Sequence, residues 1–553
     1  MKLLWPAITV ADIHASRAAL ESALDNPLAS QWAFLDGLLK SRANTAIGRD
    51  LGLGSIHSIE EFRAKVPILE HEGIAAYVTR AAAGEADVLF PGKTVHFTRT
   101  TGTTGVPKDI ALGPEYRDDV LAAIGPFFSE LETAYPGCLS HGLAFSGTFA
   151  EDRSPAGIGI GQPTGAARCV FGGVGIFDWA PEPVFSTTDF MLRYYALLYW
   201  ALNRDIRLLA VLSPSLATTF FTKGEELHEG LIADLEDGAF RRGPAGIDKL
   251  REQIAAVAPI PGPNPEAARR LRETMAKHGR FMPCEVWPNL RVISAWAHPG
   301  GQNHLDALLA LCPGADLWPM HTGSSESALF VPLKQNWRGG VPTLLSTFHE
   351  FYPEDTEPEP QNFVPLDKLE LGATYRALLT NGRGMFRYPI TDVYRVEGFY
   401  RGVPILEFSH RHGGVSLVGE KLVEPDIVNA MKSAGALDAS LTNYQFAPVK
   451  GTRLSGYVLL LEYRDRDPSV DDLAALLKRF DDALKTDTYL FGKYRVQLAP
   501  TKLALLPRGS FDQMRREKSD GKRNDAQLKD AHLRKDFIDL AALQPVHVVE
   551  LPA

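Results

Sequence analysis

The chain has 553 residues, and its 45% hydrophobic and 23% charged residues are typical of a globular protein large enough for several domains. Its formal net charge of −9 argues against a nucleic-acid-binding surface, because such surfaces are usually basic. Its four cysteines have no paired spacing, which favours a reduced compartment over a disulfide framework or a zinc site.

The N-terminal residues superficially resemble a signal peptide. Pro6 and then Asp12 and His14 interrupt the apolar pattern, however, and no clear small-residue cleavage site follows. No apolar run approaches the length of a membrane span. We therefore expect a cytoplasmic protein that binds neither a membrane nor nucleic acid. Its oligomeric state stays open, with a monomer favoured.

The longer N-terminal part of the chain alternates helical and strand-like patterns. Residues 11–80 are mainly helical, and the short apolar run at 94–97 predicts a strand. A proline followed by acidic residues after position 113 predicts the start of another helix. Such alternation favours an α/β architecture. Further helices are expected at 190–203, 216–238 and 265–278, and strands at 206–212, 290–296, 373–380 and 392–396.

Two glycine-rich stretches, at 157–161 and 172–175, have a faint similarity to dinucleotide-binding loops. Such a loop needs a strand before it and a helix directly after it. We expect neither stretch to lead into a helix, and we therefore interpret both as ordinary turns.

Glycines after Arg411 predict a domain boundary, which divides the chain into residues 1–410 and 411–553. The second part has the size and pattern of a small α/β domain. Its predicted elements are a strand at 457–463, a helix capped by Ser469, and strands at 494–498 and 502–506.

Residues 97–108 (FTRTTGTTGVPK) combine five threonine hydroxyls, two glycines and a lysine. Glycines let the backbone approach a phosphate, hydroxyls and amides donate to its oxygens, and Lys108 would neutralise its charge. The simpler alternative is a solvated polar loop. A second small-polar loop, residues 321–326 (HTGSSE), ends in the carboxylate of Glu326. Asp392 follows, and Arg411 comes nineteen residues after it.

The order of these features resembles the adenylate-forming superfamily, which includes firefly luciferase and the acyl-CoA synthetases. The resemblance implies that the first loop holds the phosphates of ATP, that Glu326 binds Mg²⁺, and that Asp392 binds the ribose hydroxyls. Arg411 would precede the hinge to a mobile C-terminal domain. The nucleotide-binding residues implied in this way are Thr100, Thr101, Gly102, Thr103, Thr104, Lys108, Thr322, Gly323, Ser324, Ser325, Asp392, Arg411 and Lys421.

Finer motifs lie in order along nearly the whole chain. They are TAIG (45–48), FRAKVP (62–67), WPNL (287–290), FHEFYP (348–353), GEKLVE (419–424), GSFD (509–512) and QLK (527–529). These motifs are similar to one branch, the acyl-acid amido synthetases of the auxin- and jasmonate-conjugating Gretchen Hagen family, and GEKLVE especially to its bacterial members. The resemblance implies a large N-terminal adenylate-forming domain and a small mobile α/β C-terminal domain. It also implies that Lys529 enters the site during adenylation.

The chain also departs from this branch. Its first loop is one residue shorter than usual, and Thr322 stands where a tyrosine usually stacks on adenine. Pro389, Ile390 and Thr391 replace the usual Arg-Val-Gly before Asp392. These changes concern the grip on the nucleotide more than the class of chemistry.

The resemblance predicts an ATP- and Mg²⁺-dependent ligase that joins a small carboxylic acid to an amino acid or amine through an acyl-adenylate. The same adenylation step could instead deliver the acyl group to coenzyme A or a carrier thiol, and a degenerate nucleotide-binding protein is a further alternative. Glu326 could be a buried structural glutamate, and Arg411 and Lys421 could be solvated or ion-paired. His321, Trp296 and Tyr116 could line the substrate pockets, with packing an equal alternative.

Overall fold

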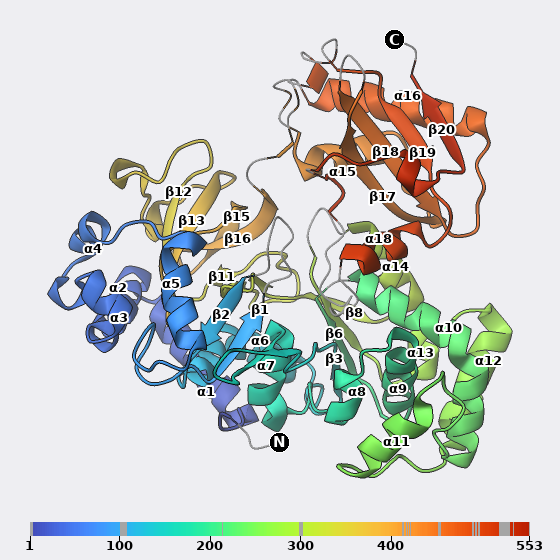
Figure 1. The fold of residues 1–553 in the computed structure, drawn as a ribbon, viewed down its shortest axis with the longest axis horizontal. Helices are drawn as coiled ribbons and strands as arrows, with labels where there is room; N and C mark the ends of the chain where they lie inside the picture. Colours follow the sequence, from blue (N-terminus) through green and yellow to red (C-terminus); the bar gives the residue numbers. More distant parts are fainter. Residues whose placement is uncertain are drawn as a thin grey trace. The chain divides into compact units, whose positions relative to one another are not determined.

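The computed structural model describes residues 4–551, except for 100–107, 213, 298–301, 412–413, 416, 418–419, 421, 452–454, 489–490, 493–494, 496–497, 519–530 and 535 (Figure 1). The chain forms two compact units. The first contains residues 1–297, 304–390 and 394–408, and the second contains residues 298–303, 391–393 and 409–553. The domain boundary placed between residues 410 and 411 stays a prediction.

The N-terminal region is helical, as its pattern predicts. Thr9 forms a capping box with Asp12, and the Asn26 side chain caps a helix that begins with Pro27. The first helix packs along α6 (Tyr116–Ala134), whose start after Pro114 also follows the prediction. The helices of this region are α1 (Val10–Leu24), α2 (Pro27–Arg42), α3 (Ala46–Asp50), α4 (Ile59–Lys65) and α5 (His71–Ala82).

A small mixed sheet carries the predicted phosphate loop. Strands β1 (His96–Arg99) and β2 (Asp109–Leu112) pair antiparallel, with Arg99 opposite Asp109, so residues 100–108 connect the two strands of a hairpin. The Arg99 guanidinium is 2.6 Å from the Asp109 carboxylate and ties the two strands together at that end. The sheet has the order β2-β1-β5-β4, where β4 is Asp152–Arg153 and β5 is Gly159–Gly161.

The interpretation of residues 157–161 as an ordinary turn is wrong for its second half. Residues 159–161 form β5, which pairs parallel with β1 and is followed almost at once by helix α7 (Pro163–Phe171). The glycine at 161 serves close packing rather than a turn, because a Cβ there would lie 1.8 Å from the carbonyl oxygen of Phe149. In contrast, Gly175 of the second stretch has φ +93 and does form a turn.

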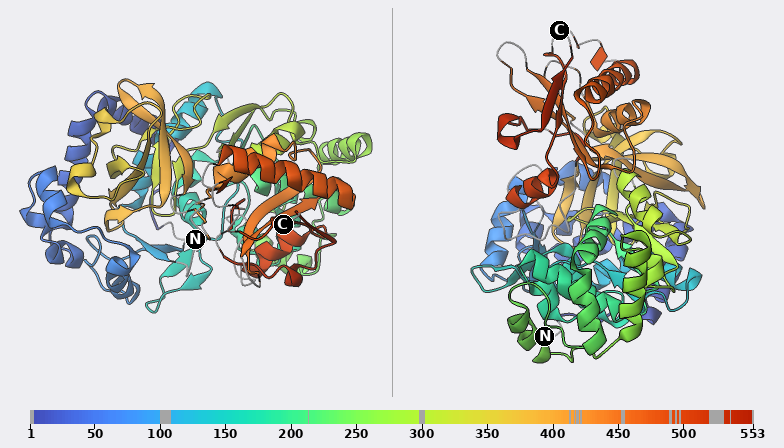
Figure 2. Two further views of the ribbon diagram at one scale, coloured as in Figure 1. Left: turned by 90° about the horizontal axis from the view of Figure 1, so that it is seen from above. Right: turned by 90° about the vertical axis from the view of Figure 1, so that its right-hand side faces the viewer.

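A four-stranded parallel sheet confirms the predicted α/β architecture. Its strands run in the order β3-β6-β7-β8, and β6 and β7 are buried along their whole length. Helix α10 packs against α9, α12 and β6, and these green helices lie together in every view of Figures 1 and 2. The elements are β3 (Gly142–Ala144), β6 (Leu208–Val211), β7 (Val292–Ala295), β8 (Asp316–Pro319), α8 (Glu182–Ser186), α9 (Phe190–Leu202), α10 (Pro214–Asp237), α11 (Ile247–Ala255), α12 (Pro265–His278), α13 (Pro283–Val286) and α14 (Gln302–Leu311).

Two further sheets complete the first unit. One is antiparallel, with the order β12-β13-β15-β16 and with β14 paired to β13, and the other has the order β11-β10-β9. The strands are β9 (Thr322–Gly323), β10 (Ala328–Val331), β11 (Val341–Pro342), β12 (Thr347–Pro353), β13 (Thr374–Asn381), β14 (Met385–Pro389), β15 (Asp392–Tyr400) and β16 (Val403–Arg411).

The second unit has its own sheet and its own apolar core, as expected for a small α/β domain. Ser469 and Asp472 form the predicted capping box at the start of α16, and Leu473, Leu477 and Phe480 of that helix are buried. The strand expected at 494–498 falls largely outside the described residues. The elements are α15 (Glu424–Ser433), α16 (Val470–Asp487), α18 (Ser510–Lys518) and a sheet of order β17-β18-β19-β20, with β17 (Leu441–Val449), β18 (Gly456–Tyr463), β19 (Lys502–Leu505) and β20 (His547–Glu550).

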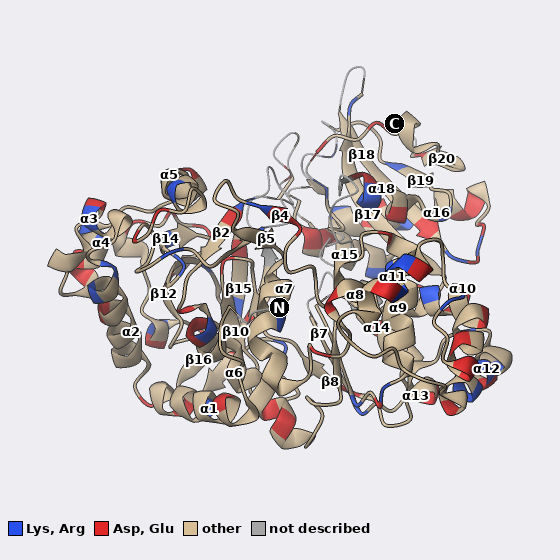
Figure 3. Ribbon diagram, turned by 60° about the horizontal axis from the view of Figure 1, so that its bottom comes forward, with Lys and Arg blue, Asp and Glu red and all other residues tan. Residues whose placement is uncertain are grey.

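Charged side chains of both signs are interspersed along the surface helices (Figure 3). On α12, for example, Arg269 pairs with Glu266 and with Glu273, at 2.7 Å each. Within the described part of the chain, no helix is both long and apolar enough to cross a membrane.

A buried ion-pair network joins two of the motifs singled out in the sequence. The side chain of Glu350, on β12, has no solvent exposure and lies 3.0 Å from Arg63 on α4 and 3.0 Å from Arg387 on β14. Arg387 also donates to the carbonyl oxygens of Arg63 and Val66, at 2.9 Å each. Arg63 of the FRAKVP motif and Glu350 of the FHEFYP motif therefore belong to one ion-pair network, which also includes Arg387.

We expect Glu350→Gln to destabilise the first unit by about 3–5 kcal/mol, because it leaves the buried Arg387 and the partly buried Arg63 without their shared carboxylate. Urea unfolding followed by tryptophan fluorescence would measure the shift. The matched control is Glu397→Gln, which removes a partner of the half-exposed Arg395 and should cost less than about 1 kcal/mol. Equal effects of the two substitutions would contradict this role for Glu350.

Candidate functional site

The threonine loop is described only at its two ends. Thr100, Thr101, Gly102, Thr103 and Thr104 lie outside the described residues, so their phosphate-binding role stays a prediction. Arg99 closes β1 on one side of the loop, and Lys108 directly precedes β2 on the other.

The second loop is a tight connection between β9 and β10. Thr322 and Gly323 form β9, and Ser324, Ser325 and Glu326 lie in the turn that follows. The Ser324 amide donates to the carbonyl oxygen of Ser327 at 2.8 Å, which closes the turn. The buried hydroxyl of Ser324 has no hydrogen-bond partner among the described residues.

Thr322 differs from the other members of this loop. Its side chain is buried, and its backbone pairs with Phe330 of β10. A threonine is much smaller than the tyrosine that the family usually has at this position, and here it lies within the sheet. Its predicted contact with the nucleotide, like those of Gly323 and Ser325, stays a prediction.

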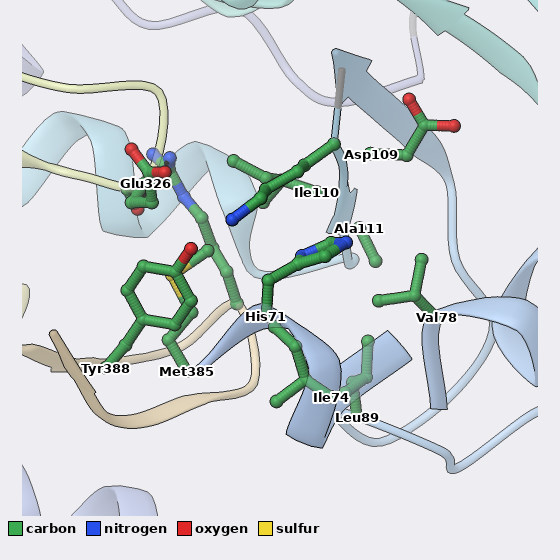
Figure 4. Close-up of a pocket in the computed structure, with 12 residues that line it drawn as sticks. His71, Ile74, Val78, Leu89, Asp109, Ile110, Ala111, Glu326, Met385 and Tyr388 are labelled. Carbon is green, nitrogen blue, oxygen red and sulfur yellow. Dashed lines mark hydrogen bonds between the residues drawn. The ribbon is translucent and has the colours of Figure 1, made fainter. Parts of the chain in front are cut away.

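One pocket is lined by both Lys108 and Glu326, although they are far apart in the sequence. Figure 4 shows this pocket, with Glu326, His71 and Tyr388 among its labelled residues. The enclosed part of the pocket is small, about 10 Å³, which is room for about one water molecule, and the rest of the space is open to solvent. Its wall on one side is apolar, and its polar groups come from four separate segments of the chain. The residues lining it are His71, Ile74, Val78, Leu89, Lys108, Asp109, Ile110, Ala111, Glu326, Arg383, Met385 and Tyr388.

The electrostatics of this pocket bear on His71 and Tyr388. Burial and the positive charge of Lys108 lower the pKa of His71, while Glu326 is among the acids that oppose this shift. The Tyr388 hydroxyl points toward the Glu326 carboxylate (Figure 4), and burial together with that negative charge raises the pKa of Tyr388. At neutral pH the pocket therefore holds a neutral imidazole and a neutral phenol between a lysine and a carboxylate.

The donor set also bears on the expected metal ion. Among the described residues, no cluster of three or more His, Cys, Asp or Glu side chains could hold a metal by itself. The sequence predicts one protein ligand, Glu326. That arrangement fits Mg²⁺, which proteins often bind through one or two carboxylates while substrate phosphates and water complete its coordination.

The remaining predicted residues belong to other parts of the chain. Asp392 is the first residue of β15 and is buried. Arg411 is the last residue of β16, and its side chain is outside the described atoms. Lys421 and Lys529 are also outside the described residues. Roles for these four residues stay predictions.

Sequence reasoning missed His71, Arg383 and Tyr388. The available signal for Arg383 was its position between two glycines in a turn, where a cation is brought close to a neighbouring backbone. His71 opens a helix, and Tyr388 lies within a strand, so neither stands out from its neighbours in the sequence. Only the pocket groups them with Lys108 and Glu326.

The three residues named as possible pocket lining make packing contacts. Tyr116 packs on Trp5, with ring centroids 5.1 Å apart, and His321 meets Phe127 edge to face at 5.6 Å. Trp296 packs on Phe408 at 5.7 Å. Exclusion from water lowers the pKa of His321 to about 4, so this imidazole is neutral at physiological pH.

Comparison with known protein families agrees with the order of the motifs. The GH3 family N-terminal domain matches residues 16–317, the GH3 family central domain matches 341–411, and the GH3 family C-terminal domain matches 425–536. The chain belongs to the GH3 family. The resemblance to the acyl-acid amido synthetases is thereby confirmed at the level of family.

Relatives of this GH3 protein include plant enzymes. The chain is 22% identical over 508 residues to a jasmonoyl–L-amino acid synthetase (JAR4) of Nicotiana attenuata, covering 86% of each chain. It is 24% identical over 496 residues to the indole-3-acetic acid-amido synthetase GH3.10 of Arabidopsis thaliana, covering 81% of this chain and 82% of the relative.

Solved structures place the GH3 chain in the adenylate-forming fold. A GH3.15 acyl acid amido synthetase matches with a TM-score of 0.82 and 20% identity, covering 97% of both chains. A 2-hydroxyisobutyryl-CoA ligase in the postadenylation state matches more distantly, with a TM-score of 0.54 and 13% identity over 93% of this chain and 90% of that one. At these identities the comparison establishes the fold.

The charges around His71 predict opposite effects of two substitutions. Lys108→Gln should raise the pKa of His71, because a nearby positive charge that disfavours the imidazolium is removed. Glu326→Gln should lower it further, because a negative charge that favours the imidazolium is lost. NMR titration of ¹³C-labelled histidine, assigned with His71→Asn, would measure both shifts.

Lys93→Gln is the control for this titration, because Lys93 is exposed and does not line the pocket. Shifts of the same sign for the two pocket variants would mean that Lys108 and Glu326 do not flank His71 as described.

Proposed function

We propose that this GH3 family member is an ATP- and Mg²⁺-dependent ligase that joins a small carboxylic acid to an amino acid. The observation that carries the proposal is the pocket in which Lys108, at the end of the threonine loop, meets Glu326 of the second loop. A lysine at the end of a glycine- and threonine-rich loop, with the carboxylate of a second loop in the same pocket, suits a metal-bound polyphosphate.

The proposed reaction has two half-reactions. In the first, a carboxylate oxygen of the acid attacks the α-phosphorus of ATP, a new O–P bond forms, and the bond to the β-phosphate breaks with release of pyrophosphate. In the second, the amine nitrogen attacks the acyl carbonyl, a C–N bond forms, the C–O bond to AMP breaks, and the ammonium proton is lost. The reactants of the first step are both anionic, so its catalysis depends on positioning and charge neutralisation.

Several of the predicted residues have a task in this scheme. The hydroxyls and amides of residues 100–104 and the ammonium of Lys108 hold the β- and γ-phosphates, and Glu326 ligates Mg²⁺. When bound, Mg²⁺ supplies positive charge to the phosphate oxygens. The Asp392 carboxylate accepts hydrogen bonds from the ribose hydroxyls. Lys529 enters from the C-terminal domain to contact the α-phosphate, and that domain then moves to admit the amine.

The substrate class follows from what the relatives share. One relative is named as a jasmonoyl–L-amino acid synthetase, a second as an indole-3-acetic acid-amido synthetase, and a third, from Arabidopsis thaliana, as a 4-substituted benzoates–glutamate ligase. For this chain we propose a small carboxylic acid and an amino acid, without choosing among them. We also propose a monomer acting in the cytoplasm.

A thioester-forming ligase is the second candidate, because the adenylate-forming fold also occurs in the 2-hydroxyisobutyryl-CoA ligase. The amide reading is favoured by the WPNL and QLK motifs and by the family match over most of the chain.

Product analysis separates the candidates. The protein is incubated with ATP, Mg²⁺ and a panel of carboxylic acids, together with either the twenty amino acids or coenzyme A. We expect AMP, pyrophosphate and an amide whose mass equals acid plus amino acid minus water. A thioester in place of the amide would favour the second candidate. Absence of AMP with every acid of a broad panel would refute both.

Lys529→Ala should abolish acyl-adenylate formation while leaving ATP binding within about threefold of wild type, because a lysine that contacts the α-phosphate during reaction acts mainly in the transition state. Pyrophosphate exchange measures the first property and calorimetric titration with ATP the second. Lys522→Ala, a lysine seven residues earlier in the sequence, is the control and should retain exchange. Unchanged exchange in Lys529→Ala would remove the assigned role.

A further inference from the structure

The turn between β13 and β14 is attached to the backbone that carries Glu326. Nη1 of Arg383 donates to the carbonyl oxygens of Ser325 at 3.0 Å and of Glu326 at 3.1 Å. Nδ2 of Asn381 donates to the same Glu326 carbonyl at 3.1 Å. Two donors on one carbonyl oxygen and a third bond on its neighbour leave this segment little freedom.

We propose that Arg383 is a positioning residue, which holds residues 325–326 so that the Glu326 carboxylate is presented to the Mg²⁺ of a bound nucleotide. The inference rests on the proposed function, and it adds a residue that the sequence motifs do not contain. Outer partners of a metal ligand fix its orientation, and their loss typically weakens metal binding by roughly 10- to 100-fold.

A hydrogen bond and two glycines determine the conformation of the turn that contains Arg383. Oδ1 of Asn381 accepts from the Arg383 amide at 3.0 Å, and Gly384 has φ +82, a left-handed conformation that favours glycine. A Cβ at Gly382 would lie 2.5 Å from Oδ2 of Asp119, and one at Gly384 would lie 2.8 Å from Leu89. The two glycines therefore let the turn approach α6 closely and direct Arg383 to the loop.

Helix α6 supplies the counter-charge for this arginine. Burial raises the pKa of the Asp119 carboxyl to about 6, while the positive charges of Arg383 and Arg42 act in the opposite direction, so this carboxyl is largely ionised at neutral pH. Tyr116, one turn earlier on the same face of α6, lies under the Arg383 guanidinium at 5.5 Å from the ring centroid. The Arg383 side chain is therefore hydrogen-bonded to the loop, lies over the Tyr116 ring and is close to the Asp119 carboxylate. These interactions fix its position, so it can orient the backbone of residues 325–326.

The other end of the Glu326 loop is fastened independently. Oγ of Ser327 is 2.8 Å from Oγ1 of Thr347, and Thr347 lies directly opposite Asn381 in the pairing of β12 with β13. Loss of Arg383 should therefore release residues 325–326 while residue 327 stays in place. The expected effect is local to the metal ligand and should not extend to the whole pocket.

The test compares ATP binding with and without metal. Calorimetric titration with ATP in saturating Mg²⁺ and in EDTA yields the factor by which Mg²⁺ strengthens binding. For Arg383→Met we expect that factor to fall by roughly 10- to 100-fold, with binding in EDTA within about threefold of wild type. Arg383→Lys, which keeps the charge without the planar fork, should recover only part of the loss. Asn381→Ala should show the same pattern more weakly.

Two controls keep folding separate from positioning. Arg395→Met, on the exposed part of β15, should leave both binding constants unchanged. In Arg383→Met the Asp119 carboxylate loses one of its two nearby cations, which should lower thermal stability. The double variant Arg383→Met with Asp119→Asn should regain that stability without regaining the Mg²⁺ effect.

The outcomes are distinct. A wild-type protein that binds no ATP would overturn the proposed function and this inference with it. Mg²⁺-dependent binding in wild type that is unchanged in Arg383→Met would overturn the positioning role alone. A loss that is equal with and without Mg²⁺ would also overturn it, because Arg383 would then contact the nucleotide directly.

Discussion

The buried carboxylate of Glu350 is the contact on which the candidate site depends. It holds Arg387 at 3.0 Å, and Arg387 has φ +47, a conformation that is strained for a residue with a side chain and costs of order 1–3 kcal/mol. The Arg387 amide also donates to Oγ1 of Thr380, at 2.9 Å. These contacts keep β14 in its irregular pairing with β13. The two strands flank the turn that follows Asn381 and contains Arg383. The ion-pair network therefore supports the strands on both sides of this turn.

The site has a layered construction. Glu350 pairs with Arg63 and Arg387, strands β13 and β14 lead from Arg387 to the turn of Asn381 and Arg383, and these two side chains bind the backbone of residues 325–326. The charged side chains in this region lie near opposite charges: Glu350 pairs with two arginines, and Arg383 lies near Asp119. Such compensation matters in a pocket meant for polyphosphate, because an unbalanced buried cation or anion would either unfold the site or move its ligands.

Much of the fold could be predicted from local signals. The helices at 190–202 and 265–278 have clear periodicity and caps, and Ser469 forms the capping box that its spacing predicts. The glycines at 159–161 misled the interpretation, because a strand that needs glycine for close packing against Phe149 has the same letters as a turn. The difference depends on the spatial contact with Phe149, which a short sequence pattern around the glycines does not contain.

The sequence by itself indicated the class of chemistry, because the order of the threonine loop, Glu326, Asp392 and the C-terminal Gln-x-Lys resembles that of a family whose domains match this chain. Only the tertiary structure decided which residues support Glu326. Arg383 and Asp119 are far apart in the chain, and they become partners because a glycine turn packs against the first turn of α6. Electrostatic interactions depend on distance in space, so the folded structure, and not the separation in sequence, determines that Asp119 lies near Arg383.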